Sequence, residues 1–373
     1  MARGTELKLS TKTRATTVTL ALAGTLALTA CGAANEGGSD TAGSTSGSLS
    51  GDLNGAGSSA QQAAMQAWQA GFSGLQSDVT VNYDPVGSGG GREQFLSGGV
   101  EFAGSDAPLN DEELTQATER CGSEGVFELP DYISAIAVVY NLPGVDELNL
   151  KPATIAGIFS GAITTWNDPA IAADNPDAQL PSTTITPVHR SDDSGTTKNF
   201  TEYLSKTAGD VWTYEPDGEW PLATGEAANG TSGVIAAVTG GEGTIGYADE
   251  SQAGDLGIAK IGVGEEFVVP SAEGAAKVVE GSELIAGRGA NDLAYEINRE
   301  TTSADEYPIV LVSYLIGCVQ YDDQKTADLV KAFTGYVISE DGQQAAADAA
   351  GSAPLSDSLR EQAQSVVDAI TAA

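Results

Sequence analysis

The sequence predicts an α/β fold with two domains. Its 373 residues are enough for two packed domains, and 41% of them are apolar. Short apolar strands alternate with amphipathic helices along the chain, which is typical of the α/β class. No period of 20–50 residues repeats, so a solenoid is not expected. Two strongly apolar strands, near residues 135 and 312, stand far apart, which allows the middle segment to be a domain inserted into the first.

The expected elements begin after residue 51. Residues 60–70 space their apolar side chains as a helix does, and residues 79–83 alternate like a strand. The Gly-rich residues 87–91 predict a loop, and residues 92–96 open the next helix. Further strands are expected at 102–105, 132–140, 184–188 and 309–316, two of them continuous apolar runs (YISAIAVVY and IVLVSYLI). Further helices are expected from 110 onward and at 150–159, 196–204, 233–239, 323–337 and 355–372.

The N-terminus has the pattern of an export signal. Basic residues precede a short apolar run, 18–30, which is too short to span a membrane. The run ends in Leu28-Thr29-Ala30-Cys31, which resembles the lipobox of bacterial lipoproteins. We therefore expect a lipoprotein signal peptide at 1–30 and lipidation at Cys31; an ordinary signal with an incidental cysteine is the alternative. The Gly, Ser and Thr of residues 31–50 predict a flexible tether.

Two cysteines, Cys121 and Cys318, remain in the body of the chain after Cys31 is set aside. Disulfides persist outside the cytoplasm, and two cysteines in an exported body most simply pair. Two separate buried thiols are the alternative.

Composition excludes several classes of function. The 17 Lys and Arg against 52 Asp and Glu give a net charge of −35, which argues against nucleic acid as a partner. His189 is the only histidine, which excludes a multi-histidine metal site, and three cysteines cannot form a four-cysteine zinc site. A Ser-His-Asp triad would have to use His189, and no P-loop motif occurs. We expect no metal and no cofactor.

Three of the segments that connect an expected strand to an expected helix are rich in glycine and in Ser or Thr hydroxyls. They are GAGSS at 55–59, GSGGG at 87–91 and DDSGTT at 192–197. Each supplies Ser or Thr hydroxyls and unhindered backbone N–H groups at a helix N-terminus, which suits a small oxyanion. A single segment of this kind is usually only a helix cap.

The order of GAGSS, NYDPVGSGGG, FAGSDAPL and HRSDDSGTTKNF resembles the phosphate-binding subunit of bacterial phosphate-specific ABC importers. The last segment is similar to that family's R-x-D-x-S-G-T motif. Further matches in family order are YNLPG at 140–144, IFSG at 158–161, TWND at 165–168 and TIGY at 244–247.

The resemblance implies a two-lobed periplasmic-binding-protein-like fold (type II) with the ligand cleft between the lobes. Two strands, near 135–141 and 308–315, would cross between the lobes. Lobe one would comprise residues 51–138 and 311–373, and lobe two residues 139–310. Both Cys121 and Cys318 would then lie in lobe one.

The family's site can be carried over residue by residue. Ser59 stands at the family's Thr, and Ala60 stands at a Phe whose backbone N–H binds the ligand. Ser88 matches a loop serine, and Asp193 stands where the family often has Gly, which adds negative charge. The implied phosphate-binding set is Ser58, Ser59, Ala60, Ser88, Asp106, Arg190, Ser194, Gly195 and Thr196, with Asp192 as the acid held against Arg190.

Asp106 is the most informative of these residues. An ionised carboxylate only accepts hydrogen bonds, so near an anion it helps only if the ligand carries a proton to donate. Phosphate near neutral pH has such a proton and sulfate has none, so Asp106 is expected to admit phosphate and reject sulfate. The alternative is an N-cap for the helix near residue 110. For Arg190 the alternative to a ligand contact is a structural salt bridge, and His189 is expected to pack beside the site.

The expected function is that of an extracytoplasmic, lipid-anchored protein that captures inorganic phosphate. It would deliver the ion to the permease and ATPase subunits of an ABC importer in the cell membrane and would not be an enzyme. A receptor of the same fold for another oxyanion and a secreted phosphatase are the alternatives. Because an acidic surface is repelled by anionic lipid, the lipid anchor must hold the protein at the membrane.

Overall fold

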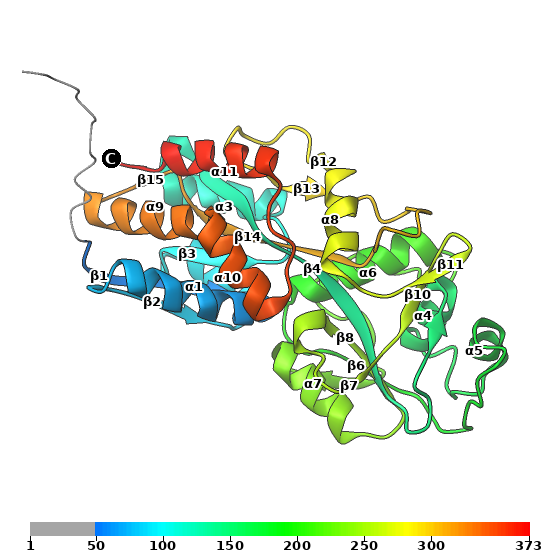
Figure 1. Cartoon of the computed structure of the whole chain (residues 1–373). Coiled ribbons are helices and arrows are strands. Elements are labelled where there is room, and N and C mark those ends of the chain that lie inside the picture. The colour runs from blue at the N-terminus through cyan, green and yellow to red at the C-terminus, as the bar shows by residue number, and fades with distance from the viewer. Residues whose placement is uncertain (1–48) are drawn as a thin grey trace, which may run out of the picture. The chain divides into compact units, whose positions relative to one another are not determined.

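A nine-stranded sheet runs through residues 49–373, the part of the chain that the computed structural model describes (Figure 1). The strand order is β2-β1-β3-β14-β4-β8-β6-β7, and β9 pairs with β4. The bounds are β1 Gly51–Gly57, β2 Val79–Asp84, β3 Phe102–Ser105, β4 Val126–Asn141, β6 Thr186–Arg190, β7 Glu226–Ala228, β8 Thr244–Asp249, β9 Gly257–Ile258 and β14 Val310–Cys318. The predicted signal peptide, the predicted lipidation site Cys31 and most of the predicted tether lie outside the described residues.

Strand β4 belongs to both halves of this sheet. Its first part pairs antiparallel with β14, and its last part, from Ile136 onward, pairs antiparallel with β8. The chain returns beside it, because the Ile136 N–H donates to the carbonyl of Ile309 at 2.8 Å, just before β14 begins. Figure 1 shows β4 running from one half to the other. The predicted two-lobed fold with two crossing strands is confirmed.

Lobe one has parallel strands β1, β2 and β3 beside the antiparallel β14. Helix α1 (Gln62–Leu75) buries Trp68 and Phe72, which lie on one helical face. The Phe72 ring meets Phe333 of α9 at 5.4 Å, and Trp68 Nε1 donates to the Gly342 carbonyl at 2.8 Å, so α1 packs on the C-terminal helices. The other helices here are α2 Ser88–Leu96, α3 Asp111–Cys121, α9 Gln324–Ile338, α10 Glu340–Ala350 and α11 Asp357–Ala369.

Lobe two has β6 parallel to both β8 and β7. Its core holds a cluster of rings: Phe200 stacks on Tyr247 at 4.3 Å, and Phe159 meets Phe200 edge-on at 4.9 Å. The helices are α4 Pro152–Phe159, α5 Pro169–Asp174, α6 Gly195–Ala208, α7 Gly230–Gly240 and α8 Ala272–Glu280. Phe200 belongs to α6, and Tyr247 belongs to β8, which pairs with β6, so this cluster supports the two elements that carry the HRSDDSGTT motif.

Smaller sheets complete the structure, and one of them bears on the predicted lobe boundaries. They are β5 Asn149–Leu150 with β10 Lys260–Val263 and β11 Glu266–Val268, β12 Glu283–Leu284 with β13 Tyr295–Glu296, and β15 Gln320–Tyr321 with β16 Thr371–Ala372. Between β12 and β13, the Leu293 N–H donates to the Glu128 carbonyl at 2.8 Å, and Arg288 pairs with the Glu128 carboxylate. We therefore propose the predicted lobes with residues 283–296 reassigned to lobe one.

Two predictions about helices need correction. Residues 88–91, predicted as loop, form the first turn of α2. Glycine disfavours a helix by about 1 kcal/mol per residue, but these glycines allow close packing, because a Cβ on Gly91 would lie 2.3 Å from the Gly57 Cα. Helices α5, α8 and α10 are not among the predicted elements, although Ser339 caps α10 and Gly351 ends it in the left-handed conformation.

The predicted disulfide is confirmed. Cys121, the last residue of α3, is bonded to Cys318, the last residue of β14, with 5.2 Å between their Cα atoms. Both cysteines lie within the residues predicted for lobe one.

A buried carboxylate, Asp249, lies where β8 meets the crossing strand. It accepts hydrogen bonds from the Tyr132 hydroxyl at 3.1 Å, the Ser134 hydroxyl at 2.5 Å and the Ser251 N–H at 3.1 Å. Burial raises the pKa of Asp249 to about 6 despite these donors. Because this folded-state pKa exceeds the unfolded value near 4, the native state holds an extra proton between the two values. The stability that this proton contributes is present at low pH and is lost as pH rises through about 6.

We expect the free energy of unfolding to reflect this titration. When the pH is raised from 4 to 7, deprotonation of Asp249 should lower the free energy of unfolding of the wild type by about 1–3 kcal/mol. Urea unfolding of wild type and Asp249→Asn over this range isolates the effect, because other carboxylates cancel in the difference. The difference should change with pH around 6, whereas Asp348→Asn, on exposed α10 surface, should give a constant difference. A constant difference for Asp249→Asn would contradict the prediction.

Candidate functional site

The structure brings the predicted site residues together from both lobes. Lobe one contributes the loop after β1, the start of α2 and the residue after β3; lobe two contributes the end of β6 and the start of α6. All of these residues are buried: Ser58, Ser59, Ala60, Ser88, Asp106, Arg190, Ser194, Gly195 and Thr196. The supporting residue Asp192 is partly exposed.

Asp106 is held by hydroxyls on both sides of the cleft. Its Oδ1 accepts from Ser313 of the crossing strand β14 at 2.7 Å, and its Oδ2 accepts from Thr196 of lobe two at 3.0 Å. Its N–H donates to Ser88 Oγ at 3.1 Å. The helix cap that was the alternative role belongs to Asn110, whose side chain accepts from the Glu112 and Glu113 N–H groups. Asp106 therefore does not cap this helix, and its carboxylate lies between Ser313 and Thr196, where the two lobes meet.

Gly195 lets the two lobes approach at this point. A Cβ on Gly195 would lie 2.8 Å from the Asp106 Cβ and 2.8 Å from Ser88 Oγ. Only glycine fits this contact without displacing lobe one. Ser194, the residue before it, caps α6 by accepting from the Thr197 N–H at 3.2 Å.

Buried Arg190 forms an ion pair with the partly exposed Asp192 at the end of β6. The Arg190 Nε donates to Asp192 Oδ1 at 2.8 Å, and its Nη2 donates to Oδ2. The Gly230 N–H also donates to Oδ1 at 3.0 Å. Burial raises the pKa of Asp192, but the hydrogen bonds and charge of Arg190 outweigh it and hold the pKa below its ordinary value. The predicted pairing is confirmed, and it fixes the guanidinium in one orientation.

The added negative charge of Asp193 pairs with Arg92, not with Arg190. Its carboxylate lies 3.5 Å from the Arg92 guanidinium, which also binds Glu113 at 2.7 Å. Burial raises the pKa of Asp193, and the charge of Arg92 counteracts part of that rise. Its carbonyl accepts from the Gly89 N–H at 3.1 Å, so Asp193 also joins the lobes.

The loop after β1 binds protein groups in this structure. Ser58 Oγ accepts from the Ala60 N–H at 3.1 Å. Ser59 Oγ accepts from the Thr231 N–H of α7 at 3.0 Å and lies 3.1 Å from the Thr231 hydroxyl. The Gln252 side-chain amide donates to the carbonyls of Ser59 and Ala60, each at 3.0 Å. This loop is therefore clamped by lobe two.

His189 packs beside the site, as expected. Its ring stacks on Trp220 at 5.0 Å, and its Nδ1 lies 2.9 Å from the Arg190 carbonyl. Tyr247 adds a second support, since its hydroxyl accepts from the Arg190 N–H at 3.3 Å and lies 2.8 Å from the Thr197 hydroxyl. Aromatic packing thus positions the strand end that carries Arg190.

Some residues of the site were not predicted from the sequence. Ser313 is a small polar residue inside an otherwise apolar strand, which is a signal in itself, because buried polar groups need partners. Thr231 follows Gly230 at the start of a helix, the same pattern as the predicted connecting segments. Gln252, and Asn199, whose side-chain amide donates to the Asp106 carbonyl at 2.6 Å, gave no such signal, since a single amide in a polar segment is ordinary.

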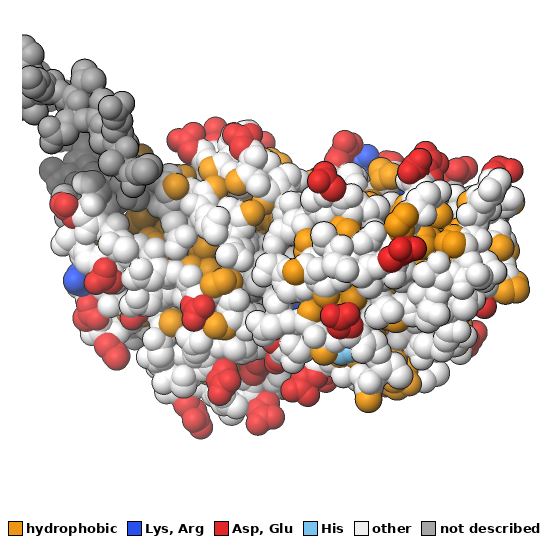
Figure 2. All heavy atoms as spheres, turned by 90° about the horizontal axis from the view of Figure 1, so that it is seen from below, with side chains coloured by type: hydrophobic (Ala, Val, Ile, Leu, Met, Phe, Trp, Pro, Cys, Tyr) orange, Lys and Arg blue, Asp and Glu red, His pale blue; other side chains and the backbone are white. Residues whose placement is uncertain are grey.

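Acidic side chains spread along the edges of the face shown in Figure 2, and few Lys or Arg appear there. The charge of Arg190, by contrast, is buried. Within residues 49–373, no group of three or more His, Cys, Asp or Glu is arranged to hold a metal ion. Over the same range, no helix combines the length and apolar character needed to cross a bilayer.

Comparison with known proteins identifies the family. A model of the PBP superfamily domain matches residues 41–341. The phosphate-binding protein PstS2 of Mycobacterium bovis (strain BCG / Pasteur 1173P2) is 37% identical over 366 residues, which cover 95% of this chain and 98% of that protein. The phosphate-binding protein PstS 3 of Mycobacterium leprae is 37% identical over 297 residues, 78% of this chain and 79% of that protein.

Solved structures share the fold. A high-affinity periplasmic phosphate-binding protein (PfluDING), bound with phosphate, superposes with a TM-score of 0.69 at 22% identity, over 84% of this chain and 93% of that one. A phosphate-binding protein from Stenotrophomonas maltophilia gives 0.66 at 20% identity, over 85% of this chain and 94% of that one. The chain belongs to the PBP superfamily and, within it, to the PstS family of phosphate-binding proteins.

Proposed function

We propose that this protein captures inorganic phosphate outside the cytoplasm and delivers it to the permease and ATPase subunits of an ABC importer. The observation that carries the proposal is the hydrogen bond between Asp106 and Thr196 across the cleft. It places an acceptor carboxylate from one lobe among the hydroxyl and amide donors of the other. The family membership and the names of the relatives support the same function.

The proposed chemistry follows from donors and acceptors. A carboxylate has about four lone-pair positions, so Asp106 can accept a ligand O–H besides its two hydroxyl donors. The hydroxyls of Ser59, Ser88 and Thr196 can rotate toward ligand oxygens, and the N–H groups at the start of α6 favour an anion. Arg190, fixed by Asp192, would supply the positive charge at a desolvated position.

The test of this proposal is competition between phosphate and sulfate. In Asp106→Asn the amide gains an N–H donor and loses the charge, so phosphate binding should persist while discrimination against sulfate falls, by about 10–100-fold. Asp193→Asn is the matched control, because it removes a carboxylate that faces Arg92 and should leave the ratio unchanged. Titration calorimetry at fixed salt measures both affinities. An unchanged ratio in Asp106→Asn would assign selectivity to another residue.

The alternatives give different outcomes in the same assays. A receptor for another oxyanion would prefer sulfate or molybdate in the wild-type titration. A secreted phosphatase would turn over p-nitrophenyl phosphate, whereas the proposed protein binds phosphate stoichiometrically and releases no nitrophenol. We propose no catalytic step, no metal and no cofactor.

We also propose that the protein is anchored to the outer face of the cell membrane by a lipid on Cys31. The sequence Leu28-Thr29-Ala30-Cys31 supports this. Cys31→Ser should leave the signal uncleaved or release the protein from the membrane fraction, since a thioether-linked lipid needs the sulfur. Ser44→Ala, in the same segment, should fractionate like wild type. If Cys31→Ser also fractionates and migrates like wild type, the anchor is elsewhere.

A further inference from the structure

We infer that Asn199 is a latch across the cleft, a positioning residue that holds Asp106 when the lobes are closed and slows the release of phosphate. The inference rests on the proposed function. It concerns a residue outside the phosphate-binding set, on the second turn of α6 in lobe two.

The latch is one side-chain amide with partners in both lobes. Asn199 Nδ2 donates to the backbone carbonyl of Asp106 at 2.6 Å and to the carbonyl of Gly195 at 2.9 Å. Asp106 belongs to lobe one, and Gly195 is the first residue of α6 in lobe two. Asn199 is 7% exposed, so these bonds form in a desolvated environment. One side-chain amide therefore connects Asp106, the residue proposed to select phosphate, to the first turn of α6 in the other lobe.

The orientation of this amide is set by Arg299. An arginine side chain only donates hydrogen bonds, and Arg299 Nη2 donates to Asn199 Oδ1, so Nδ2 must point toward Asp106. The rest of the guanidinium is also engaged, with the carbonyls of Pro308 and Val310 at 3.3 and 3.2 Å and with Glu202 at 2.9 Å. These two carbonyls belong to the segment that crosses between the lobes at the start of β14. Arg299 therefore connects Asn199 to this crossing segment.

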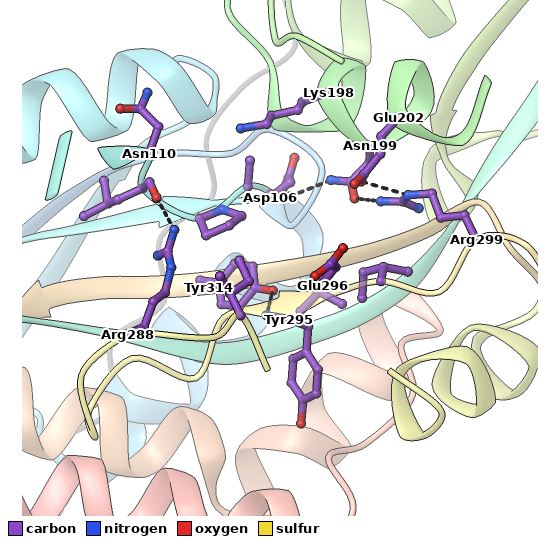
Figure 3. A pocket seen from close by; sticks show the side chains of 16 residues that line it. Asp106, Asn110, Lys198, Asn199, Glu202, Arg288, Tyr295, Glu296, Arg299 and Tyr314 are labelled. Carbon is purple, nitrogen blue, oxygen red and sulfur yellow. Dashed lines mark hydrogen bonds and ion pairs between the residues drawn. The ribbon is translucent and has the colours of Figure 1, made fainter. Parts of the chain in front are cut away.

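Figure 3 shows this arrangement on the wall of a cavity of about 310 Å³. Asn199 lies between Asp106 and Arg299, with Glu202 beside it, and Arg288 and Tyr314 lie on the lobe-one side. The cavity is thus lined from both lobes, and the bond from Asn199 to Asp106 spans the boundary between them.

The position of the latch determines which rate it controls. The bond to the Asp106 carbonyl can form only when α6 approaches the end of β3, that is, after the lobes close. Losing it should therefore destabilise the closed state without affecting the encounter of phosphate with the open state. A residue with a merely structural role would lower stability and leave both rates alone.

The test compares two buried asparagines of lobe two. Asn199→Ala should accelerate the release of labelled inorganic phosphate, chased with unlabelled phosphate, by about three- to tenfold, while the association rate stays within about twofold of wild type. Asn175→Ala is the control. Asn175 also makes three hydrogen bonds, but all of them go to Asn149 and Ile171 in its own lobe, so its loss should leave both rates unchanged.

The outcomes separate the latch from the proposed function. If wild type binds no inorganic phosphate, the proposed function fails and the latch fails with it. If wild type binds phosphate but Asn199→Ala releases it at the wild-type rate, or loses association rate instead, the latch alone is overturned. Should Asn199→Ala not fold, Asn199→Ser keeps an acceptor for Arg299, is too short to reach Asp106 and should show the same faster release.

Discussion

Arg190→Met should abolish tight phosphate binding, with a loss of about 2–5 kcal/mol, or roughly 30-fold to several thousand-fold in Kd. The variant removes a charge-assisted donor from a desolvated site and leaves Asp192 without its cation next to an anion. Methionine keeps most of the apolar stem that packs in lobe two, so the fold should persist. Titration calorimetry with phosphate at fixed salt gives the Kd.

A double variant separates the two parts of this loss. Arg190→Met with Asp192→Asn removes the uncompensated carboxylate, so part of the affinity should return. Arg360→Met is the control, because Arg360 pairs with Glu340 at 3.2 Å and Asp357 at 2.7 Å in α10 and α11 and should leave the affinity unchanged. Wild-type affinity in Arg190→Met would place the site elsewhere and leave Arg190 as a structural salt bridge.

The fold could be predicted where sequence and packing agree. In α1 the apolar positions already carry the helical spacing that buries Trp68 and Phe72. The two apolar strands were expected because a strand buried on both faces is apolar throughout, and both β4 and β14 are buried along nearly their whole length. Local propensity failed at Ser88–Gly91, where close approach to Gly57 outweighs the poor helix propensity of glycine.

The site could be predicted only where a motif carries it. Asp106, Arg190 and the start of α6 belong to short segments that resemble a known family, so their roles were expected and their convergence is seen in the structure. Asn199, Gln252 and Arg299 act through single long-range bonds from positions with no local pattern. A contact such as that between Asn199 and Asp106, 93 residues apart, depends on how the lobes meet. No spacing rule along the sequence encodes that geometry.

The high negative charge does not conflict with an anion site. At physiological salt the Debye length is about 8 Å, so exposed carboxylates act weakly on a buried ion. Within that distance the donors are Arg190 and local hydroxyls and amides, while Asp193 is compensated by Arg92. Long-range attraction of phosphate should be absent, so the association rate should rise or stay level when salt is added.

Removing the disulfide should lower the free energy of unfolding by about 2–5 kcal/mol, because the bridge restricts an unfolded chain over a separation of 197 residues. Urea unfolding of wild type and the Cys121→Ser, Cys318→Ser double variant measures the loss. Phosphate affinity should not change. In the register of β3 and β14, Gly317 pairs with Phe102 whereas Tyr314 pairs with Ser105, so Cys318 lies at the opposite end of β3 from Asp106. Reductant should destabilise wild type and leave the double variant unaffected. A variant as stable as wild type, or one that loses phosphate affinity while folded, would show that the bridge acts on the site and not on the unfolded chain.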